Sequence, residues 1–547
     1  MTEWVCLLPI GVVLAAALVV VFLDLVLGRA ERYVLPWVAL AGCVLGIAAV
    51  WQTHQTLSDQ LVWFRGYDAK ANSQGLGPLL LGGAFCLDGF GLSIWLLACL
   101  AGALSILASP QPSPHPLADA AVGQAVSLPL PSQAGQPAPQ KPEMDSALSS
   151  GEYYGLLLLA VAGMMLLGVA HDWLTLVLSL EIMSVATYVL AGSSREDIRS
   201  NESALKYVVL GGFSTAFLLL GIAFYYGAFG SLSLTPNPAL HHLTVAELQS
   251  RELFALLALG LVLVGALFKI GATPFHFWIP DVYQGAPTAV TGLMAFGVKA
   301  AAFAVVARVA FETFGGFAFR ATWLPLLLAG SVLTMLIGNL LAMRQSNLKR
   351  LLAYSAIAHS GYLLLAFLVV PHDHDGAAMN EHLKAVVFYL LVYGVMTLGA
   401  FGVVALVRED GRPLENMDDY AGLAKEHPGV ALCMAIFMLS LAGLPPTGGF
   451  FAKFMIFRGA IEQGIIEQPQ RQSMIILAAV IGILTSVASL YYYLRVVVTM
   501  YMSPSAATVA PEAPPAARCR YAWAVNLLIY LAGLATLASG LIPAWFY

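Results

Sequence analysis

Long apolar segments separated by short polar loops recur along the whole 547-residue chain. A helix needs about 20 mainly apolar residues to cross the ~30 Å hydrocarbon core of a bilayer. The pattern therefore predicts an all-α, polytopic membrane protein with about fourteen transmembrane helices. The predicted spans lie near residues 5–27, 34–53, 79–107, 153–170, 173–191, 204–227, 252–280, 286–313, 323–343, 351–370, 382–407, 429–463, 472–502 and 521–544.

The composition agrees with this class of protein. Hydrophobic residues make up 59% of the chain and charged residues only 10%, whereas about a quarter of the residues of a soluble domain are charged. Basic residues concentrate in alternate short loops, which we place in the cytoplasm, so that both termini are expected outside. The lipid bilayer and other membrane proteins are the expected partners, and nucleic acid is not.

The order of spans and linkers divides the chain. An N-terminal segment of three helices (1–108) precedes a loop rich in Pro, Ala, Ser and Gln (109–150), whose composition predicts a flexible cytoplasmic segment. Two sets of five helices follow (151–314 and 315–502), and a linker with a final helix (503–547) ends the chain. Because five is odd, the second set enters from the opposite face, which predicts two inverted repeats.

Each five-helix set contains a helix interrupted by proline. In the first set, Pro274 has no N–H and its ring displaces the carbonyl of Ile270, next to Lys269. In the second set, the Pro445-Pro446-Thr447-Gly448-Gly449 stretch comes shortly before Lys453. Broken backbone at membrane depth is tolerated only where it is buried in protein or lines a water-filled cavity. These two stretches therefore predict an ion path.

Four charged residues lie well inside predicted spans: Glu181, Lys269, Lys299 and Lys453. An ammonium at the centre of a bilayer costs at least ~2.5–3.5 kcal/mol, so such a side chain persists only in a wet or paired interior. We interpret them as proton-carrying groups, the three lysines forming a lateral row linked by water. The alternative is a structural role, with each group hydrogen-bonded between helices.

Glu181 and Lys269 are candidates for an ion pair, if their helices touch. At ~4 Å and an effective dielectric constant of ~20, the pair would be worth ~4 kcal/mol. Separating the two charges would then favour release of the lysine's proton, so the pair could load and release a proton.

Three further residues are candidates for the relay. His276 and His359 are possible intermediate stations, because imidazole exchanges protons readily near neutral pH. A packing role for each histidine is an equal alternative. Lys206, near the start of its span, either joins the relay or extends its ammonium to the membrane surface.

No cofactor or metal is expected in this chain. Neither a GxxxxGK[ST] phosphate loop nor a dinucleotide-binding glycine motif after a strand is present. The six cysteines are scattered, with no CxxC pair, so buried structural thiols are the expected reading.

Several strings in the chain resemble the antiporter-like membrane subunits of bacterial complex I (NADH:quinone oxidoreductase), in particular subunit N. They are FKIGATPFHFWIPDVYQGAPTAVTGLMAFGVKAAAF, KRLLAYSAIAHSGYLLLAF, DDYAGL and SLAGLPPTGGFFAKF. The resemblance covers nearly the whole chain apart from 109–150 and 503–520.

This resemblance implies a fourteen-helix fold with two inverted repeats in the bacterial cytoplasmic membrane. It also implies an enzyme subunit that translocates protons but holds no redox centre, with FMN and iron–sulfur clusters in other subunits that use NADH and quinone. Neighbouring antiporter-like subunits would be its partners. By resemblance, Glu181, Lys269, Lys299 and Lys453 match the family's buried glutamate and lysines, and His276 and His359 match histidines in the same strings.

Two other functions stay open at this point. A cation/proton antiporter subunit of the multi-subunit sodium-extruding type would share the same helical core. A purely structural membrane scaffold would tolerate replacement of all four buried charges. Copurification of the chain with flavin and iron–sulfur subunits favours a complex I subunit. Sodium-dependent exchange without those subunits favours the antiporter.

Overall fold

The computed structural model describes most of the membrane-embedded chain. The predicted loop at 109–150 lies outside the described residues except at its two ends, and so does most of the linker that begins at 503. The described residues are 2–58, 61, 63, 79–81, 84–109, 150–234, 245–314, 317–367, 377–409, 412–466, 469–504 and 523–543.

Nearly all regular structure is helical. The N-terminal segment contains α1 (Thr2–Val26), η1 (Arg29–Val34), α2 (Leu35–Leu57) and α3 (Gly89–Ala108). The next group contains α5 (Ser150–Val169), α6 (Trp173–Ala191), α7 (Ile198–Phe229), α8 (Val245–Ile270), α9 (Trp278–Gly285), α10 (Thr288–Leu293), η5 (Met294–Val298), α11 (Lys299–Arg308) and η6 (Val309–Thr313). The last contains α12 (Phe317–Ala342), α13 (Leu348–Ala366), α14 (Ala377–Leu406), η7 (Met417–Tyr420), α15 (Leu423–Glu426), α16 (Pro428–Ala442), α17 (Gly448–Ile466), α18 (Pro469–Met502) and α20 (Trp523–Leu541).

Twelve membrane-length apolar helices occur in the described residues, which confirms the prediction of an all-α polytopic membrane protein. Two of the fourteen predicted spans are not among the twelve. The span at 351–370 corresponds to α13, and the span at 429–463 is divided between the short helix α16 and α17.

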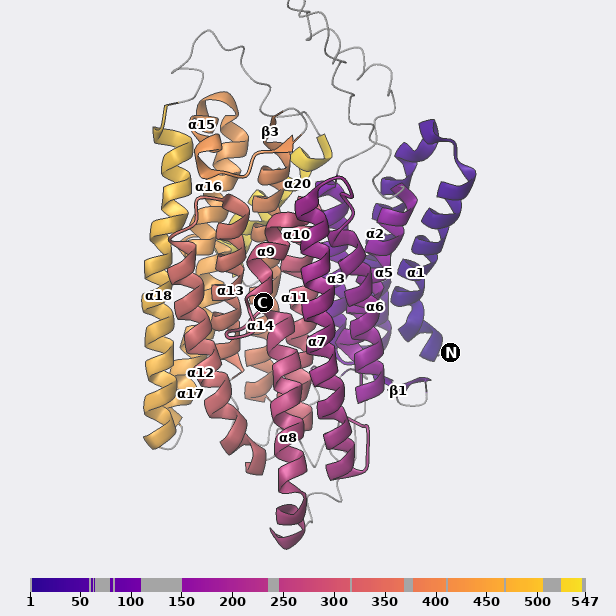
Figure 1. Ribbon diagram of the computed structural model, residues 1–547, viewed down its shortest axis with the longest axis vertical. Helices are drawn as coiled ribbons and strands as arrows, with labels where there is room; N and C mark the ends of the chain where they lie inside the picture. Colours follow the sequence, from indigo (N-terminus) through magenta and orange to yellow (C-terminus); the bar gives the residue numbers. More distant parts are fainter. Residues whose placement is uncertain are drawn as a thin grey trace, which may run out of the picture.

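Two short antiparallel hairpins accompany the helices. The strands β1 (Leu79–Leu80) and β2 (Phe85–Cys86) pair before α3, and β3 (Arg408–Glu409) and β4 (Arg412–Pro413) pair after α14. The hairpins lie at opposite ends of the molecule's long axis (Figure 1).

The helices stand roughly side by side, with α1 and α2 at one edge and α18 at the other (Figure 1). Both predicted helix breaks are present, between α8 and α9 and between α16 and α17. In Figure 1, α9 continues above α8, whereas α17 lies below α16. The two broken helices thus run in opposite directions along the long axis, as inverted repeats require.

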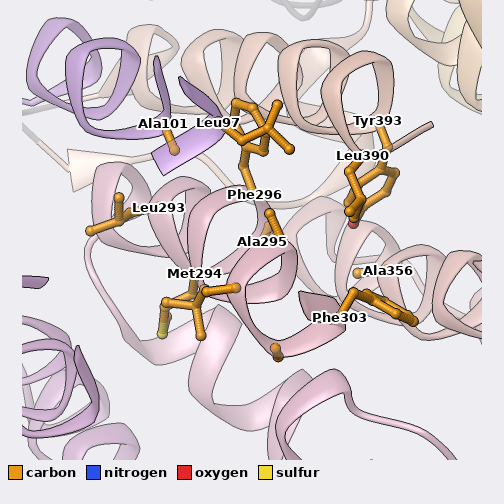
Figure 2. Close-up of a cluster of buried hydrophobic side chains, with 14 of the residues drawn as sticks. Leu97, Ala101, Leu293, Met294, Ala295, Phe296, Phe303, Ala356, Leu390 and Tyr393 are labelled. Atoms are coloured by element: carbon orange, nitrogen blue, oxygen red, sulfur yellow. The ribbon is translucent and has the colours of Figure 1, made fainter. Parts of the chain in front are cut away.

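The helix that carries Lys299 is the centre of the core. It runs through α10, η5, α11 and η6, and all of residues 288–313 are buried. Phe296 packs toward α3 and α14 in the apolar cluster of Figure 2. On α14 only glycine fits opposite it, because a Cβ on Gly394 would lie 1.9 Å from Cδ2 of Phe296. The π-helical turn η5 precedes Lys299 directly, and such turns are frequent at functional sites.

Candidate functional site

The first helix break closes with a glycine cap. Helix α8 ends at Ile270, Gly271 follows with φ 71°, and the N–H of Ala272 donates to the Leu267 carbonyl at 2.9 Å. This is a Schellman closure, in which a left-handed residue ends the helix. Pro274 has no N–H, so it cannot continue the helix by bonding to the Ile270 carbonyl.

The second break has the same construction. Gly443 follows α16 with φ 87°, and the next N–H donates to the Leu439 carbonyl at 3.1 Å. The carbonyls of Leu441 and Ala442 would take N–H donors from residues 445 and 446 in a continuous helix, but both residues are proline. These two carbonyls at the end of α16 are therefore left without a backbone N–H donor.

Lys453, on α17, fills these two positions. Its Nζ donates to the carbonyls of Leu441 at 2.8 Å and Ala442 at 3.1 Å, and to Oγ of Ser486 at 2.8 Å. The ammonium also lies 5.1 Å from the centroid of the Tyr362 ring, within cation–π range. Since the C-terminus of a helix carries partial negative charge, it stabilises the ammonium there.

Lys269 is held differently, by two hydroxyls of α6. Its Nζ donates to Oγ of Ser184 at 2.9 Å and to the Tyr188 hydroxyl at 3.2 Å. Glu181 lies on the same helix and is half-buried, and its Oε1 accepts the hydroxyl proton of Thr215 at 2.8 Å. No Glu181–Lys269 ion pair of 4.0 Å or less occurs in the described chain. The two helices do meet, but in this state the charges are separated.

Lys299 is held by α13. Its Nζ donates to the carbonyl of Ala356 at 2.5 Å and to Oγ of Ser360 at 2.9 Å, and it lies 5.0 Å from the centroid of the Tyr393 ring. Ser360 in turn donates to the carbonyl of Ile270 at 2.7 Å. One serine thus touches both the central lysine and the end of broken helix α8.

His359 lies between the second and third lysines. Its Nδ1 is 2.7 Å from the Tyr389 hydroxyl, and its Nε2 is 3.4 Å from the Tyr493 hydroxyl. The imidazole is 1% exposed. Its ring centroid lies 4.9 Å from that of Tyr393, the ring that faces Lys299, and 5.6 Å from that of Tyr362, the ring that faces Lys453. This arrangement brings three of the predicted residues into one buried group.

The three lysine sites share a common environment. Each ammonium donates to a serine hydroxyl at 2.8–2.9 Å and lies 5.0–5.5 Å from a tyrosine ring centroid. None forms an ion pair of 4.0 Å or less with a carboxylate in the described residues. Neutral oxygens therefore hold all three, so a proton can leave without breaking a salt bridge. The serine partners were not predicted, because they come from other helices.

His276 is apart from this group. It follows the first break, is half-buried, and its Nδ1 lies 3.3 Å from Oγ1 of Thr273. No hydrogen bond recorded among the described residues joins it to a lysine, so the structure separates the two histidines that sequence treated alike.

Lys206 belongs to a group of surface charges. Its Nζ lies 2.6 Å from Glu202 Oε1 and 2.7 Å from Asp281 Oδ2, with its side chain 38% exposed. Asp281 also pairs with Arg350 at 2.8 Å. These ion pairs join α7, α9 and α13 around Asp281, in the first turn of α9. No hydrogen bond of Lys206 in the described chain connects it to Lys269, Lys299 or Lys453.

Two other buried cations were missed by sequence reasoning. Lys349 Nζ donates at 2.8 Å to the carbonyls of Gln284 and Ala286, just past α9, and lies 3.4 Å from Glu415. It caps the end of α9 as lysines do at helix C-termini. A run of basic residues at 344–350 reads as a cytoplasmic loop, which concealed this role.

The second is Arg308, at the far end of the helix that carries Lys299. Its guanidinium pairs with Glu312 at 2.6 Å and Asp88 at 3.1 Å and donates to the Gly168 carbonyl at 2.7 Å. All three charged side chains are at most 2% exposed. The group fastens the start of α3 and the end of α5 to η6, and the Arg308/Glu312 spacing of four was its only sequence signal.

The region that holds these residues matches a known family of membrane proteins. The family model described as "NADH:quinone oxidoreductase/Mrp antiporter, TM" matches residues 170–485, which include every predicted site residue. NADH-quinone oxidoreductase subunit N of Trichlorobacter lovleyi is 46% identical over 65% of this chain and 68% of its own. Subunit N 1 of Koribacter versatilis is 34% identical over 100% of this chain and 94% of its own.

Solved structures give the same grouping. A chain of respiratory complex I from Thermus thermophilus with bound Aureothin matches with a TM-score of 0.69 and 30% identity, covering 98% of this chain and 97% of that one. A chain of the Mrp complex from Dietzia sp. DQ12-45-1b has a TM-score of 0.72, with 98% and 95% coverage. At 21% identity, the latter shows a shared fold alone.

The chain therefore belongs to the membrane-protein family that NADH:quinone oxidoreductases share with Mrp antiporters. Within it, the chain groups with the subunit N proteins of NADH-quinone oxidoreductase. It is a multi-pass, proton-translocating membrane subunit of that complex, which confirms the first functional hypothesis over the antiporter alternative.

Proposed function

We propose that protons cross this subunit through a buried row of Glu181, Lys269, Lys299, His359 and Lys453. One observation supports the row above all. The three lysines are held by hydroxyls and carbonyls, without a carboxylate in salt-bridge contact in the described chain. Each can then change its protonation without leaving a buried carboxylate unpaired, which would be costly.

In this proposal the transfer begins with a change of charge at Glu181, the first member of the row. When a proton reaches Glu181 or leaves it, the electric field at Lys269 changes, because Lys269 binds Ser184, which lies one turn from Glu181 on α6. Ser184 and Tyr188 keep the ammonium close by. The loss or gain of the carboxylate's charge thus favours release or uptake of a proton by the lysine.

The proton then moves along the second half of the row. His359 would take a proton from Lys299 and give it to Lys453, because its ring lies against Tyr393 and Tyr362, the two rings that these ammonium groups face. Imidazole can do both, since each of its nitrogens carries or accepts a proton. Water between these groups would complete the path.

His276 and Lys206 have lesser roles in this proposal. His276 borders the first break and would contact the water that reaches it. Lys206 would organise the surface charges around Asp281, in the first turn of α9. The chain would lie in the bacterial cytoplasmic membrane with both termini outside. FMN, iron–sulfur clusters, NADH and quinone would act in other subunits, and neighbouring antiporter-like subunits would adjoin this one.

The test is replacement of the histidine that joins Lys299 to Lys453. In the complete complex, His359→Gln keeps a hydrogen-bonding side chain but cannot carry the proton. Pumping should therefore fall by at least about tenfold, since a proton-transfer group typically contributes about a hundredfold or more. Proton uptake into vesicles and assembly of the complex are measured together. Normal pumping by an assembled His359→Gln complex would contradict the row. If the chain purifies without flavin and iron–sulfur subunits and shows sodium-dependent exchange, a cation/proton antiporter subunit would be supported instead.

A further inference from the structure

Ser360 connects Lys299 to the helix break beside Lys269, although it lies 61 residues from the lysine and 90 from the break. It lies on α13, is fully buried, and follows His359. Its Oγ accepts a hydrogen bond from Lys299 Nζ at 2.9 Å and donates one to the Ile270 carbonyl at 2.7 Å. Ile270 is the last residue of α8 and the neighbour of Lys269.

The Ile270 carbonyl receives its hydrogen bond from Ser360 and not from the backbone of its own helix. In a continuous helix its donor would be the N–H of residue 274, but that residue is proline. The neighbouring N–H groups are engaged elsewhere: that of Ala272 bonds to Leu267, and that of Thr273 bonds to Oγ1 of Thr334. The break therefore leaves a buried acceptor that the Ser360 hydroxyl satisfies.

A serine hydroxyl has a single proton to give. While Lys299 is an ammonium, it has only donors, so Ser360 must accept from it and its proton is free to go to Ile270. Once Lys299 is a neutral amine, its nitrogen has a lone pair, and the Ser360 proton can turn toward it. The carbonyl at the break then loses its donor and must bind water or move, because a buried acceptor is costly to leave unpaired.

We propose that Ser360 is a positioning residue that couples the protonation of Lys299 to the helix break next to Lys269. This rests on the proposed proton row and adds a physical link between the two lysines of the first five-helix set, made by a serine of the second set. The coupling works in both directions: water that binds the Ile270 carbonyl releases the Ser360 proton, which then favours the neutral form of Lys299.

The other two serines that bind a lysine, Ser184 and Ser486, have different hydrogen-bond partners from Ser360. Ser184 donates to the Leu180 carbonyl of its own helix at 2.6 Å, a carbonyl that the helix itself already pairs. Ser486 lies 3.4 Å from the carbonyl of Ala442 at the second break, where Lys453 binds directly. Ser360 can also turn to Ala356 at 3.1 Å, but the Ile270 carbonyl is closer. Only at Ser360, among these three, does one hydroxyl join a lysine to the break beside another lysine.

The test compares Ser360→Ala with Ser331→Ala in the complete complex. Ser331 is an equally buried serine of α12, which donates at 2.7 Å to the carbonyl of Gly361, the residue after Ser360. The control thus removes a similar hydrogen bond from the same region without touching a lysine. Proton pumping into vesicles is measured across a range of pH, with the amount of assembled complex as the reference.

We expect Ser360→Ala to lower the pumping rate by about fivefold, the effect typical of one lost hydrogen bond. Its pH profile should shift to lower pH, because the Lys299 ammonium loses an acceptor. Ser360→Thr, which keeps the hydroxyl, should restore pumping and the profile, and Ser331→Ala should leave the profile in place. If Ser360→Ala fails to assemble, Ser360→Cys, with its weaker donor, should show the same shift to a smaller extent.

An unshifted pH profile in Ser360→Ala or Ser360→Cys, or the same shift in Ser331→Ala, would overturn the coupling. Lys299→Ala is measured beside them to separate this inference from the proton row. If Lys299→Ala pumps normally, the row itself fails. If Lys299→Ala stops pumping while Ser360→Ala behaves as Ser331→Ala, only the coupling fails.

Discussion

The two helix breaks have nearly the same backbone but hold their lysines in different ways. Both end a helix with a left-handed glycine, Gly271 or Gly443, followed by proline. Lys453 turns back onto the carbonyls of its own break. Lys269 instead reaches across to the hydroxyls of α6, with Glu181 one turn away.

This difference indicates a division of labour. The carbonyls at the second break are fixed dipoles, so they contribute a constant electric field at Lys453. Lys269 has hydroxyl partners that can reorient and a carboxylate whose charge can change. The first repeat is therefore suited to respond to a signal, and the second to hold and pass on a proton.

The largest effect should come from removing the responsive lysine. Lys269→Ala should lower proton pumping by about tenfold or more, because a proton-transfer group is lost. Assembly should be retained, since no buried partner of opposite charge is left unpaired. The measurement is proton uptake into vesicles normalised to assembled complex. Pumping at the native rate would show that the first repeat does not depend on this lysine.

Glu181→Gln sharpens the comparison, because it removes the carboxylate's charge and keeps an acceptor for Thr215. Lys269 then lies beside a constant neutral group, as Lys453 does, so we expect pumping to fall by about fivefold. Thr215→Val serves as a control that removes the hydrogen bond but not the charge. If both variants pump equally, the hydrogen bond matters and the charge of Glu181 does not.

The smallest effect is expected at Lys206, outside both breaks. Because its ion pairs are partly exposed, Lys206→Ala should lower the free energy of unfolding by at most about 1 kcal/mol and change pumping by less than about twofold. Thermal unfolding and vesicle assays measure the two effects. A loss of pumping as large as that of Lys269→Ala would place Lys206 inside the proton row and weaken the contrast between the repeats.

Much of this site could be predicted from the sequence. Lys269, Lys299 and Lys453 stand out because an ammonium is rare in an apolar span, and Pro274 reveals the first break because it lacks an N–H. Hydropathy also gave the membrane class, although α13 and α16 fall outside the twelve long apolar helices. These features depend on single residues or on short stretches.

What could not be predicted depends on contacts between helices. Nothing local marks Ser184 or Ser360 as the partner of a lysine, because each lies more than 60 residues from the lysine it holds. The sequence likewise could not separate His359 from His276, because both lie in apolar surroundings. Glu181 and Lys269 bind hydroxyl groups and not each other in the described chain. This depends on side-chain conformation, which no residue pattern encodes.

The proton row is tested most directly by an experimental structure of the complete complex that shows ordered water. We predict an unbroken series of waters and side chains joining Lys269, Lys299, His359 and Lys453, with one water near the Ile270 carbonyl wherever Ser360 has turned away from it. Apolar side chains packed without water between any two neighbouring members of the row would contradict it.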